Sequence, residues 1–242
     1  MKKSKPEAEA DREVWRAREA ENMQKQRLGA EAGEGAGGHE PVAAELHNIL
    51  RRFIAARSGV LEAAAEAIAR SVRAGGKVLV FGNGGSAAEA QHFAAELVNG
   101  MQHRDRPPIP AIALTTDTSS LTAIGNDRGF ALVFSRQVEA LGRPGDVAIA
   151  LTTSGTSPNV VEALKTARAK GLVTLGLTGE GGSEVAPLAD YLLDVPSRST
   201  PRIQEAHLFI LHLLAERLEK NLEGCLEANN RGIFSSEPGS EA

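Results

Sequence analysis

Two residues capable of acid–base chemistry, His92 and Glu96, stand four positions apart in a segment with a helical pattern. Side chains at positions i and i+4 lie on the same face of an α-helix, about one turn apart. An imidazole and a carboxylate in this arrangement can share a metal ion or pass a proton. A solvated ion pair is the alternative interpretation, and the glycine-rich loop just before this helix makes it the less favoured one.

The glycine-rich loop reads GNGGS and covers residues 82–86, between an apolar run and the helix. Glycines let the backbone approach a ligand closely, and a helix N-terminus offers free N–H groups and the positive end of its dipole. The loop therefore predicts an anion site, most simply for a phosphate. Gly82, Gly84 and Ala87 also fit the dinucleotide fingerprint, but no acidic residue follows at the distance of about 20 residues that it requires. Dinucleotide binding and a plain tight turn are the weaker alternatives.

A second loop of small residues, TTSGTS at 152–157, also follows an apolar run and precedes a helix. Its hydroxyl groups could serve only as caps and turns. Two such loops on one sheet instead favour a phosphate cradle built from hydroxyl and backbone donors. No Walker lysine follows, so we predict a sugar phosphate rather than a nucleotide.

The last helical segment carries Gln204 and His212. Eight residues span about 12 Å along a helix axis. Both side chains can therefore reach one ion only if Gln204 lies at the helix mouth or if different subunits contribute. Taken alone, His212 within its apolar run would more often be a hydrogen-bonded core residue.

The elements that must position these residues follow from the apolar pattern. The expected strands cover 77–81, 111–114, 146–151, 172–177 and 191–195, and the expected helices cover 86–98, 132–141, 157–170 and 202–222. The strand segments are continuously apolar, as strands buried on both faces are. Strand–helix–strand repetition with short connections predicts an α/β protein with a doubly wound, parallel, five-stranded sheet.

Helical patterns flank this sheet on both sides in the sequence. Apolar residues repeat at helical spacing over 46–54 and again over 61–72, with Ser58 and Gly59 between them, so we predict an N-terminal helical hairpin. The long C-terminal helix is apolar almost all round at 208–211, and we expect it to be buried between subunits.

Composition limits the function classes. The 242 residues are 42% hydrophobic and 24% charged, with a net charge of −4, which does not favour a nucleic-acid partner. Neither a run of 18 apolar residues nor an apolar signal segment is present, so we expect no membrane partner and a cytoplasmic protein. Cys225 is the only cysteine, which excludes an intrachain disulfide. We expect a charged, disordered or loosely helical extension at 1–40, one domain at 41–224 and a flexible tail at 225–242.

Six segments, in order, resemble the sugar isomerase (SIS) domain of phosphoheptose isomerases. They read VLVFGNGGSAAEAQHFAAEL, PAIALTTD, AIGNDRGF, LTTSGTSPNVVEAL, VTLGLTG and RIQEAHLFILH, and the likeness extends from about residue 42 to residue 222. The resemblance implies a flavodoxin-like SIS fold. It also implies an aldose–ketose isomerase that converts D-sedoheptulose 7-phosphate to D-glycero-D-manno-heptose 7-phosphate through an enediol. That reaction is the first step toward ADP- or GDP-heptose for lipopolysaccharide or other surface polysaccharide.

The resemblance also implies roles for individual residues. Glu96 and His212 would be catalytic, and one zinc ion per subunit would be held by His92, Glu96, Gln204 and His212. The implied substrate-binding residues are Asn83, Gly84, Gly85, Ser86, Glu96, Asn126, Asp127, Thr152, Thr153, Ser154, Ser157 and Gln204. The family further implies a homotetramer with its sites at subunit interfaces.

This chain departs from the family at one position. Many members carry an arginine near the substrate phosphate shortly after the H-x-x-x-E helix, and here the nearest candidate, Arg104, is displaced by a few residues. Two other functions stay open: a non-catalytic SIS protein that binds a replication initiator, and a sugar-phosphate sensor. Initiator-binding relatives lack the glutamate of H-x-x-x-E and the last histidine. This chain has both, which favours an enzyme.

Overall fold

The computed structural model describes residues 39–103 and 105–222. The strands are β1 (Val78–Gly82), β2 (Ala111–Ala113), β3 (Val147–Thr152), β4 (Val173–Thr178) and β5 (Tyr191–Asp194). The helices are α2 (Glu40–Arg73), α3 (Gly85–Asn99), α4 (Thr118–Arg128), α5 (Ser135–Leu141), α6 (Pro158–Ala169) and α7 (Thr200–Leu222), with short 3₁₀ helices η2 (Phe130–Leu132) and η3 (Ala186–Leu188). The chain divides into two compact units, Met1–Glu45 and Leu46–Ala242. Of the first unit, only the start of α2 is described.

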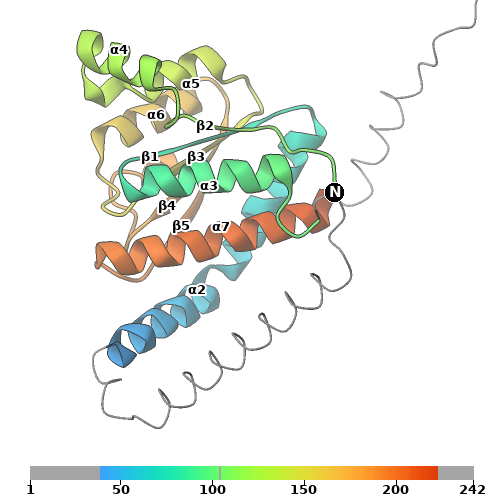
Figure 1. Cartoon of the computed structure of the whole chain (residues 1–242), viewed down its shortest axis with the longest axis vertical. Coiled ribbons are helices and arrows are strands. Elements are labelled where there is room, and N and C mark those ends of the chain that lie inside the picture. The colour runs from blue at the N-terminus through green and yellow to red at the C-terminus, as the bar shows by residue number, and fades with distance from the viewer. Residues whose placement is uncertain (1–38, 104, 223–242) are drawn as a thin grey trace, which may run out of the picture. The chain divides into compact units, whose positions relative to one another are not determined.

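All five strands are parallel, in the order β2-β1-β3-β4-β5 (Figure 1). The chain moves outward from β1 to β2, then crosses back to place β3 on the other side of β1. Ligands of such sheets bind beyond the carboxyl ends of the strands, at the point where the winding reverses. The loops after β1 and β3 therefore meet at the binding edge. The predicted α/β fold with a doubly wound, five-stranded parallel sheet is confirmed.

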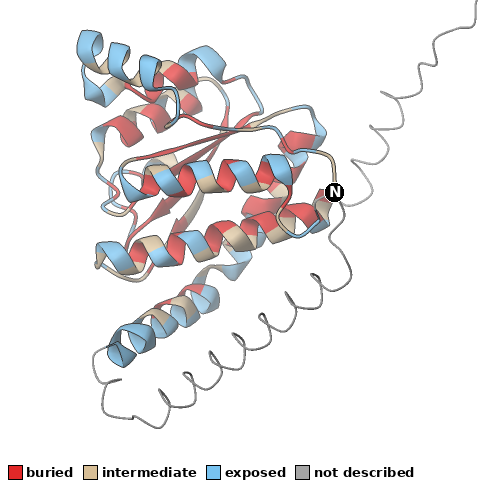
Figure 2. Ribbon diagram, in the orientation of Figure 1, coloured by how far each residue is buried: buried red, intermediate tan, exposed pale blue. Residues whose placement is uncertain are grey.

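The sheet separates two apolar cores, because successive side chains of a strand point to opposite faces. Val78 and Val80 of β1 pack with α3, α7 and the part of α2 that follows Glu45. Leu79 and Phe81 pack with α5 and α6 on the other face. Strands β1 and β3 are buried along their whole length and β4 along nearly all of it (Figure 2), which explains why these strands appear in the sequence as continuous apolar runs. The edge strands β2 and β5 are only partly buried.

The predicted N-terminal hairpin is wrong, because residues 40–73 form one helix, α2, of 34 residues. Gly59 in a helix interior costs only about 1 kcal/mol relative to alanine, and no proline blocks the backbone. The buried residues Ile49, Phe53, Leu61 and Ile68 also keep one helical phase across that glycine. A single helix therefore buries both apolar stretches on the same side.

The pattern analysis missed α4. None of its residues is buried, so it has no apolar stripe to detect. Its start is marked by Asp117, whose side chain accepts a hydrogen bond from the Ser120 amide at 3.0 Å. This N-cap was the one signal in the sequence that could have identified the helix.

Several predictions concern residues outside the described ranges. Residues 1–38, Arg104 and residues 223–242 are not described, so the expectations for the extension at 1–40, for Arg104, for Cys225 and for the tail at 225–242 stay predictions. Within the described ranges, no helix combines the length and the apolar character needed to cross a bilayer.

The central strand generates a stability prediction. Ile149 of β3 is fully buried, and truncating it leaves a cavity in the middle of the core. We expect Ile149→Ala to lower the free energy of unfolding by about 2–5 kcal/mol, measured by urea denaturation. The matched control is Ile112→Ala on edge strand β2, where the side chain is 39% exposed. The control should lose about 1 kcal/mol or less, and equal losses in the two variants would contradict the assignment of β3 as the central strand.

Candidate functional site

The candidate site lies along the contact between α3 and α7, which run side by side and parallel (Figure 1). At the start of the two helices, the Gln204 amide lies against the backbone of Gly85. Further along, His92 meets His212, and past the end of α3 the backbone of Met101 meets Glu219. This ordered series of contacts fixes which residues of the two helices face one another.

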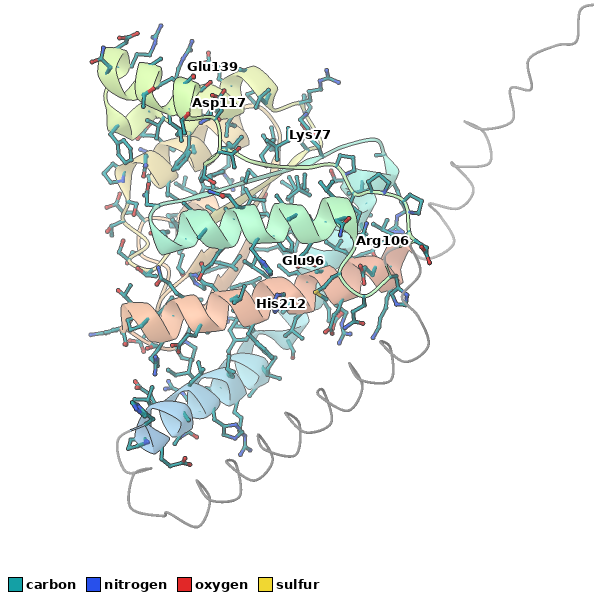
Figure 3. The ribbon with its side chains drawn as sticks, viewed as in Figure 1. Lys77, Glu96, Arg106, Asp117, Glu139 and His212 are labelled. Carbon is teal, nitrogen blue, oxygen red and sulfur yellow. The ribbon has the colours of Figure 1, made fainter. Side chains whose placement is uncertain are left out.

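In the middle of this contact, three ionisable side chains come together. Nε2 of His92 lies 2.8 Å from Nε2 of His212, and the two rings meet edge to face. The same nitrogen of His92 lies 3.7 Å from Oε1 of Glu96. Figure 3 shows Glu96 and His212 in the strip between α3 and α7. The Glu96 carboxylate and the His212 imidazole, which are distant in the sequence, therefore both lie close to the His92 imidazole.

A small polar cavity of about 70 Å³ lies where the loops after β1 and β3 meet. It is lined by Asn83, Ser86, Leu151, Thr152, Thr153, Ser157 and Gln204. The hydroxyl of Thr152 is 3.1 Å from that of Ser157 and 3.4 Å from that of Ser154. The N-terminal ends of α3 and α6 begin beside this cavity, so their free N–H groups and dipoles favour an anion there. Both predicted phosphate loops thus contribute to one cavity.

The two loops are held together by a reciprocal amide pair. Asn83 donates to Asn159 at 2.9 Å, and Asn159 donates back at 2.8 Å. Asn159 is buried in the first turn of α6 and was not predicted as a site residue. Nothing in the sequence signals it, because its partner lies 76 positions away.

The glycines of the first loop are needed for close approach. Gly84 has a φ of +56°, in the left-handed region that favours glycine. A Cβ on Gly85 would lie 2.4 Å from Nε2 of Gln204, so any larger residue would displace the Gln204 amide from this position. Gln204 therefore borders the polar cavity, and its amide lies at the start of α3 rather than at the histidine pair.

A second ionisable pair, Glu89 and His207, lies buried between the cavity and the histidine pair. Nε2 of His207 is 3.2 Å from the Thr178 carbonyl oxygen, which can only accept, so this nitrogen carries the hydrogen. Nδ1 faces Oε2 of Glu89 at 3.9 Å. Burial lowers the pKa of His207 to about 4, although the bond to Thr178 opposes this change. Burial raises the pKa of Glu89 to about 7, against a hydrogen bond from Ser86 that lowers it.

Two predicted substrate residues lie elsewhere. Asn126 and Asp127 are exposed on α4, where the Asn126 amide donates to the Asp127 carboxylate at 2.8 Å. The described contacts do not link them to the cavity. Arg104 is outside the described residues, and the nearby Arg106 points inward, where it donates to the Glu96 carbonyl at 2.9 Å.

The histidine pair and Glu96 offer donor atoms for a metal ion. Within 39–103 and 105–222, no three or more His, Cys, Asp and Glu side chains form a cluster arranged to hold an ion. Two imidazoles and a carboxylate are nonetheless donors that zinc prefers. Tetrahedral zinc separates its nitrogen ligands by about 3.3 Å, so the two Nε2 atoms, now 2.8 Å apart, would move apart by about 0.5 Å. The donor types fit zinc.

Comparisons with known proteins identify the family of this chain. The SIS domain family matches residues 43–179. A phosphoheptose isomerase from Nitratidesulfovibrio vulgaris is 58% identical over 149 residues, which cover 62% of this chain and 71% of the relative. The solved phosphoheptose isomerase of Neisseria gonorrhoeae is 40% identical with a TM-score of 0.69, and the match covers 81% of this chain and 99% of that one. The Francisella tularensis phosphoheptose isomerase structure is 37% identical with a TM-score of 0.72, over 74% of this chain and 95% of that one.

The buried Glu89 carboxyl generates a prediction about pH and stability. The folded protein holds this proton more tightly than the unfolded chain, whose carboxyl has the ordinary pKa of 4.5. This stabilisation is complete below pH 4.5 and is lost as the pH rises through about 7. Glu89→Gln removes the titration. We therefore expect the free energy of unfolding of the wild type to fall relative to the variant between about pH 5 and pH 8.

Urea denaturation at a series of pH values measures this difference. His207 titrates in both proteins, so its opposite contribution cancels in the comparison. Glu205→Gln on the exposed side of α7 is the matched control and should follow the wild type. Parallel pH curves for wild type and Glu89→Gln would show that Glu89 is not buried as described.

Proposed function

This chain belongs to the phosphoheptose isomerases of the SIS domain family, and we propose that its substrate is D-sedoheptulose 7-phosphate. It converts this ketose to D-glycero-D-manno-heptose 7-phosphate, an aldose, through an enediol. One observation carries the proposal: the Glu96 carboxylate and the His212 imidazole both approach His92, on the helix that begins at a phosphate-sized polar cavity. The product would enter the synthesis of nucleotide-activated heptose for surface polysaccharide.

The phosphate end of the substrate belongs in the polar cavity. Ser86, at the first turn of α3, and the hydroxyl residues Thr152, Thr153 and Ser157 line this cavity and offer neutral donors there. From Ser86 to His92 the helix rises about 9 Å. That distance suits an extended sugar chain that has its phosphate in the cavity and its carbonyl end at the histidine pair.

The reacting end of the substrate belongs beside Glu96 and His212. Ketose-to-aldose conversion requires a base at the C–H group and an acid at the neighbouring oxygen. We assign removal of the carbon-bound proton to the Glu96 carboxylate. His212 moves a proton to and from the oxygens, and its imidazole lies beside His92, with 2.8 Å between the two Nε2 atoms.

We propose one zinc ion per subunit, with His92, Glu96, Gln204 and His212 as its ligands. When bound, zinc would supply a Lewis acid that polarises the substrate oxygens. His92, His212 and Glu96 already lie together. Gln204 lies against Gly85, eight residues before His212 and about 12 Å away along α7, so the Gln204 ligand of this ion would come from a neighbouring subunit. As a neutral ligand it would leave the site tolerant of the negative charge of an enediolate.

We also propose a cytoplasmic homotetramer. An apolar groove of about 430 Å³ lies over α2 and α7, lined by His47, Leu50, Arg51, Ile54, Ala55 and Phe209. The neighbouring Leu208 is 37% exposed. An apolar groove of this kind suits coverage by another chain, which supports the proposed assembly. Asn126 and Asp127 would then contact substrate across a subunit interface rather than within their own chain.

The two rival functions fit the site less well. A non-catalytic initiator-binding protein or a sugar-phosphate sensor would need the polar cavity alone. Neither function requires a carboxylate and an imidazole that both lie close to a second imidazole. The convergence of these three side chains therefore favours the isomerase.

The acid–base roles generate a mutational prediction. We expect Glu96→Gln and His212→Gln each to lower kcat by about 10²–10⁴-fold, because each removes one proton-transfer group. Substrate binding should persist, since the cavity is left intact. The assay follows aldose formation from sedoheptulose 7-phosphate, with titration calorimetry for binding. Glu162→Gln, in an exposed ion pair on α6, is the control and should behave as wild type. Near-normal turnover in either site variant would refute its role.

The zinc proposal is tested by metal removal. We expect the purified protein to contain about one zinc per chain by elemental analysis, and His92→Ala to contain much less, because the variant loses one of four ligands. A chelator should abolish turnover, and added zinc should restore it. A chelated protein shown to be free of metal, yet fully active, would rule out the zinc site.

A further inference from the structure

A buried carboxylate near the end of α7, Glu219, lies two helical turns beyond His212. Its side chain is 2% exposed, and it accepts hydrogen bonds from the backbone amides of Met101, Gln102 and His103 at 2.8, 3.2 and 3.3 Å. It also accepts from Nε of Arg106 at 3.1 Å. Burial alone would raise the pKa of Glu219, but these hydrogen bonds outweigh it and hold the pKa below its usual value. Glu219 is therefore a fixed anion.

The arginine bound to this carboxylate also reaches α3. The Arg106 side chain is 9% exposed, and its guanidinium donates at 2.9 Å through Nη2 to the backbone carbonyl of Glu96. Nη1 donates at 2.9 Å to the Pro107 carbonyl, which fixes the plane of the group. In Figure 3, Arg106 lies beyond the end of α3, apart from the Glu96 and His212 side chains. One guanidinium thus joins the Glu96 backbone to a carboxylate on α7.

The connection through Arg106 can affect the positions of the reacting groups, because its two ends attach close to them. One end holds the residue that carries the proposed base, Glu96. The other end holds α7 seven residues after the proposed acid, His212. A displacement of about 1 Å between reacting groups can cost about 10²-fold in rate. The polar cavity lies at the opposite end of α3, so the connection has no direct effect on phosphate binding.

We propose that Arg106 and Glu219 are positioning residues for the isomerisation. They set the alignment of α3 against α7 and thereby hold the Glu96 carboxylate and the His212 imidazole at the separation that proton transfer requires. This inference rests on the proposed function. Neither residue touches the substrate, and a role limited to fold stability would leave kcat of the folded protein unchanged.

The test uses the full-length protein with Arg106→Gln, Arg106→Lys and Glu219→Gln. We expect kcat for sedoheptulose 7-phosphate to fall about 10–100-fold, with KM within about 3-fold of wild type. Proton transfer should become the slower step. The primary isotope effect on kcat with substrate deuterated at the transferred position should therefore increase. Arg106→Lys keeps the charge but cannot bridge both acceptors, so it should share the loss of kcat.

The matched control is the exposed ion pair of Arg217 on α7 with Glu62 on α2, which meet at 2.6 Å. Arg217→Ala removes a salt bridge from the same helix without touching the α3 connection, and it should keep the wild-type kcat and isotope effect. Circular dichroism identifies the variants that are folded. If Arg106→Gln or Glu219→Gln fails to fold, the folded Arg106→Lys carries the test.

The outcomes separate the inference from the function on which it rests. A wild-type protein that does not isomerise sedoheptulose 7-phosphate would refute the proposed function. An active wild type, together with folded Arg106 variants that keep its kcat and isotope effect, would overturn the positioning role alone. If the Arg106 and Glu219 variants lost no more kcat than Arg217→Ala, the positioning role would also be overturned.

Discussion

The parallel alignment of α3 with α7 is the constraint on which the site depends. Strand β1 delivers the chain to the binding edge of the sheet, and α3 then leads back along the sheet toward its other edge. His92 and Glu96 lie on the side of α3 that meets α7. Without α7 in this register, these residues would be an isolated surface pair with no second imidazole. The chemistry is therefore a property of two helices that are more than 100 positions apart in the sequence.

Polar contacts between α3 and α7 recur along the two helices. Each of these polar contacts, or layers, is made by a different set of residues. At the start, Gln204 rests on Gly85 beside the anion cavity. Glu89 and His207 follow, then the histidine pair with Glu96, and at the end the Arg106–Glu219 pair. Buried polar groups are costly unless they are hydrogen-bonded, so the histidine pair and the Arg106–Glu219 pair penalise a shift of one helix along the other. Apolar packing between the layers, through residues such as Phe93 and Leu211, supplies the attraction but tolerates more sliding.

The sequence predicted the parts of this arrangement that depend on local pattern. Continuous apolar runs identified all five strands, and glycine and hydroxyl residues after β1 and β3 marked the binding edge. It could not predict contacts between distant segments, such as Asn83 with Asn159 or Glu89 with His207. The hairpin error shows that Ser58 and Gly59 do not end a helix whose apolar stripe continues in phase. The sequence did not single out Arg106, because the resemblance places the family's arginine near the substrate phosphate. The acceptors of Arg106 lie at the other end of α3.

The central claim is that Glu96 and His212 act on one bound ketose, and hydrogen exchange in deuterated water tests it most directly. Mass spectrometry of recovered sedoheptulose 7-phosphate and of the aldose product measures solvent deuterium at the two carbons that exchange the proton. The account predicts that the wild type incorporates deuterium, and that Glu96→Gln binds the substrate but leaves its carbon-bound hydrogens in place. Deuterium incorporation by Glu96→Gln at the wild-type rate would contradict the account.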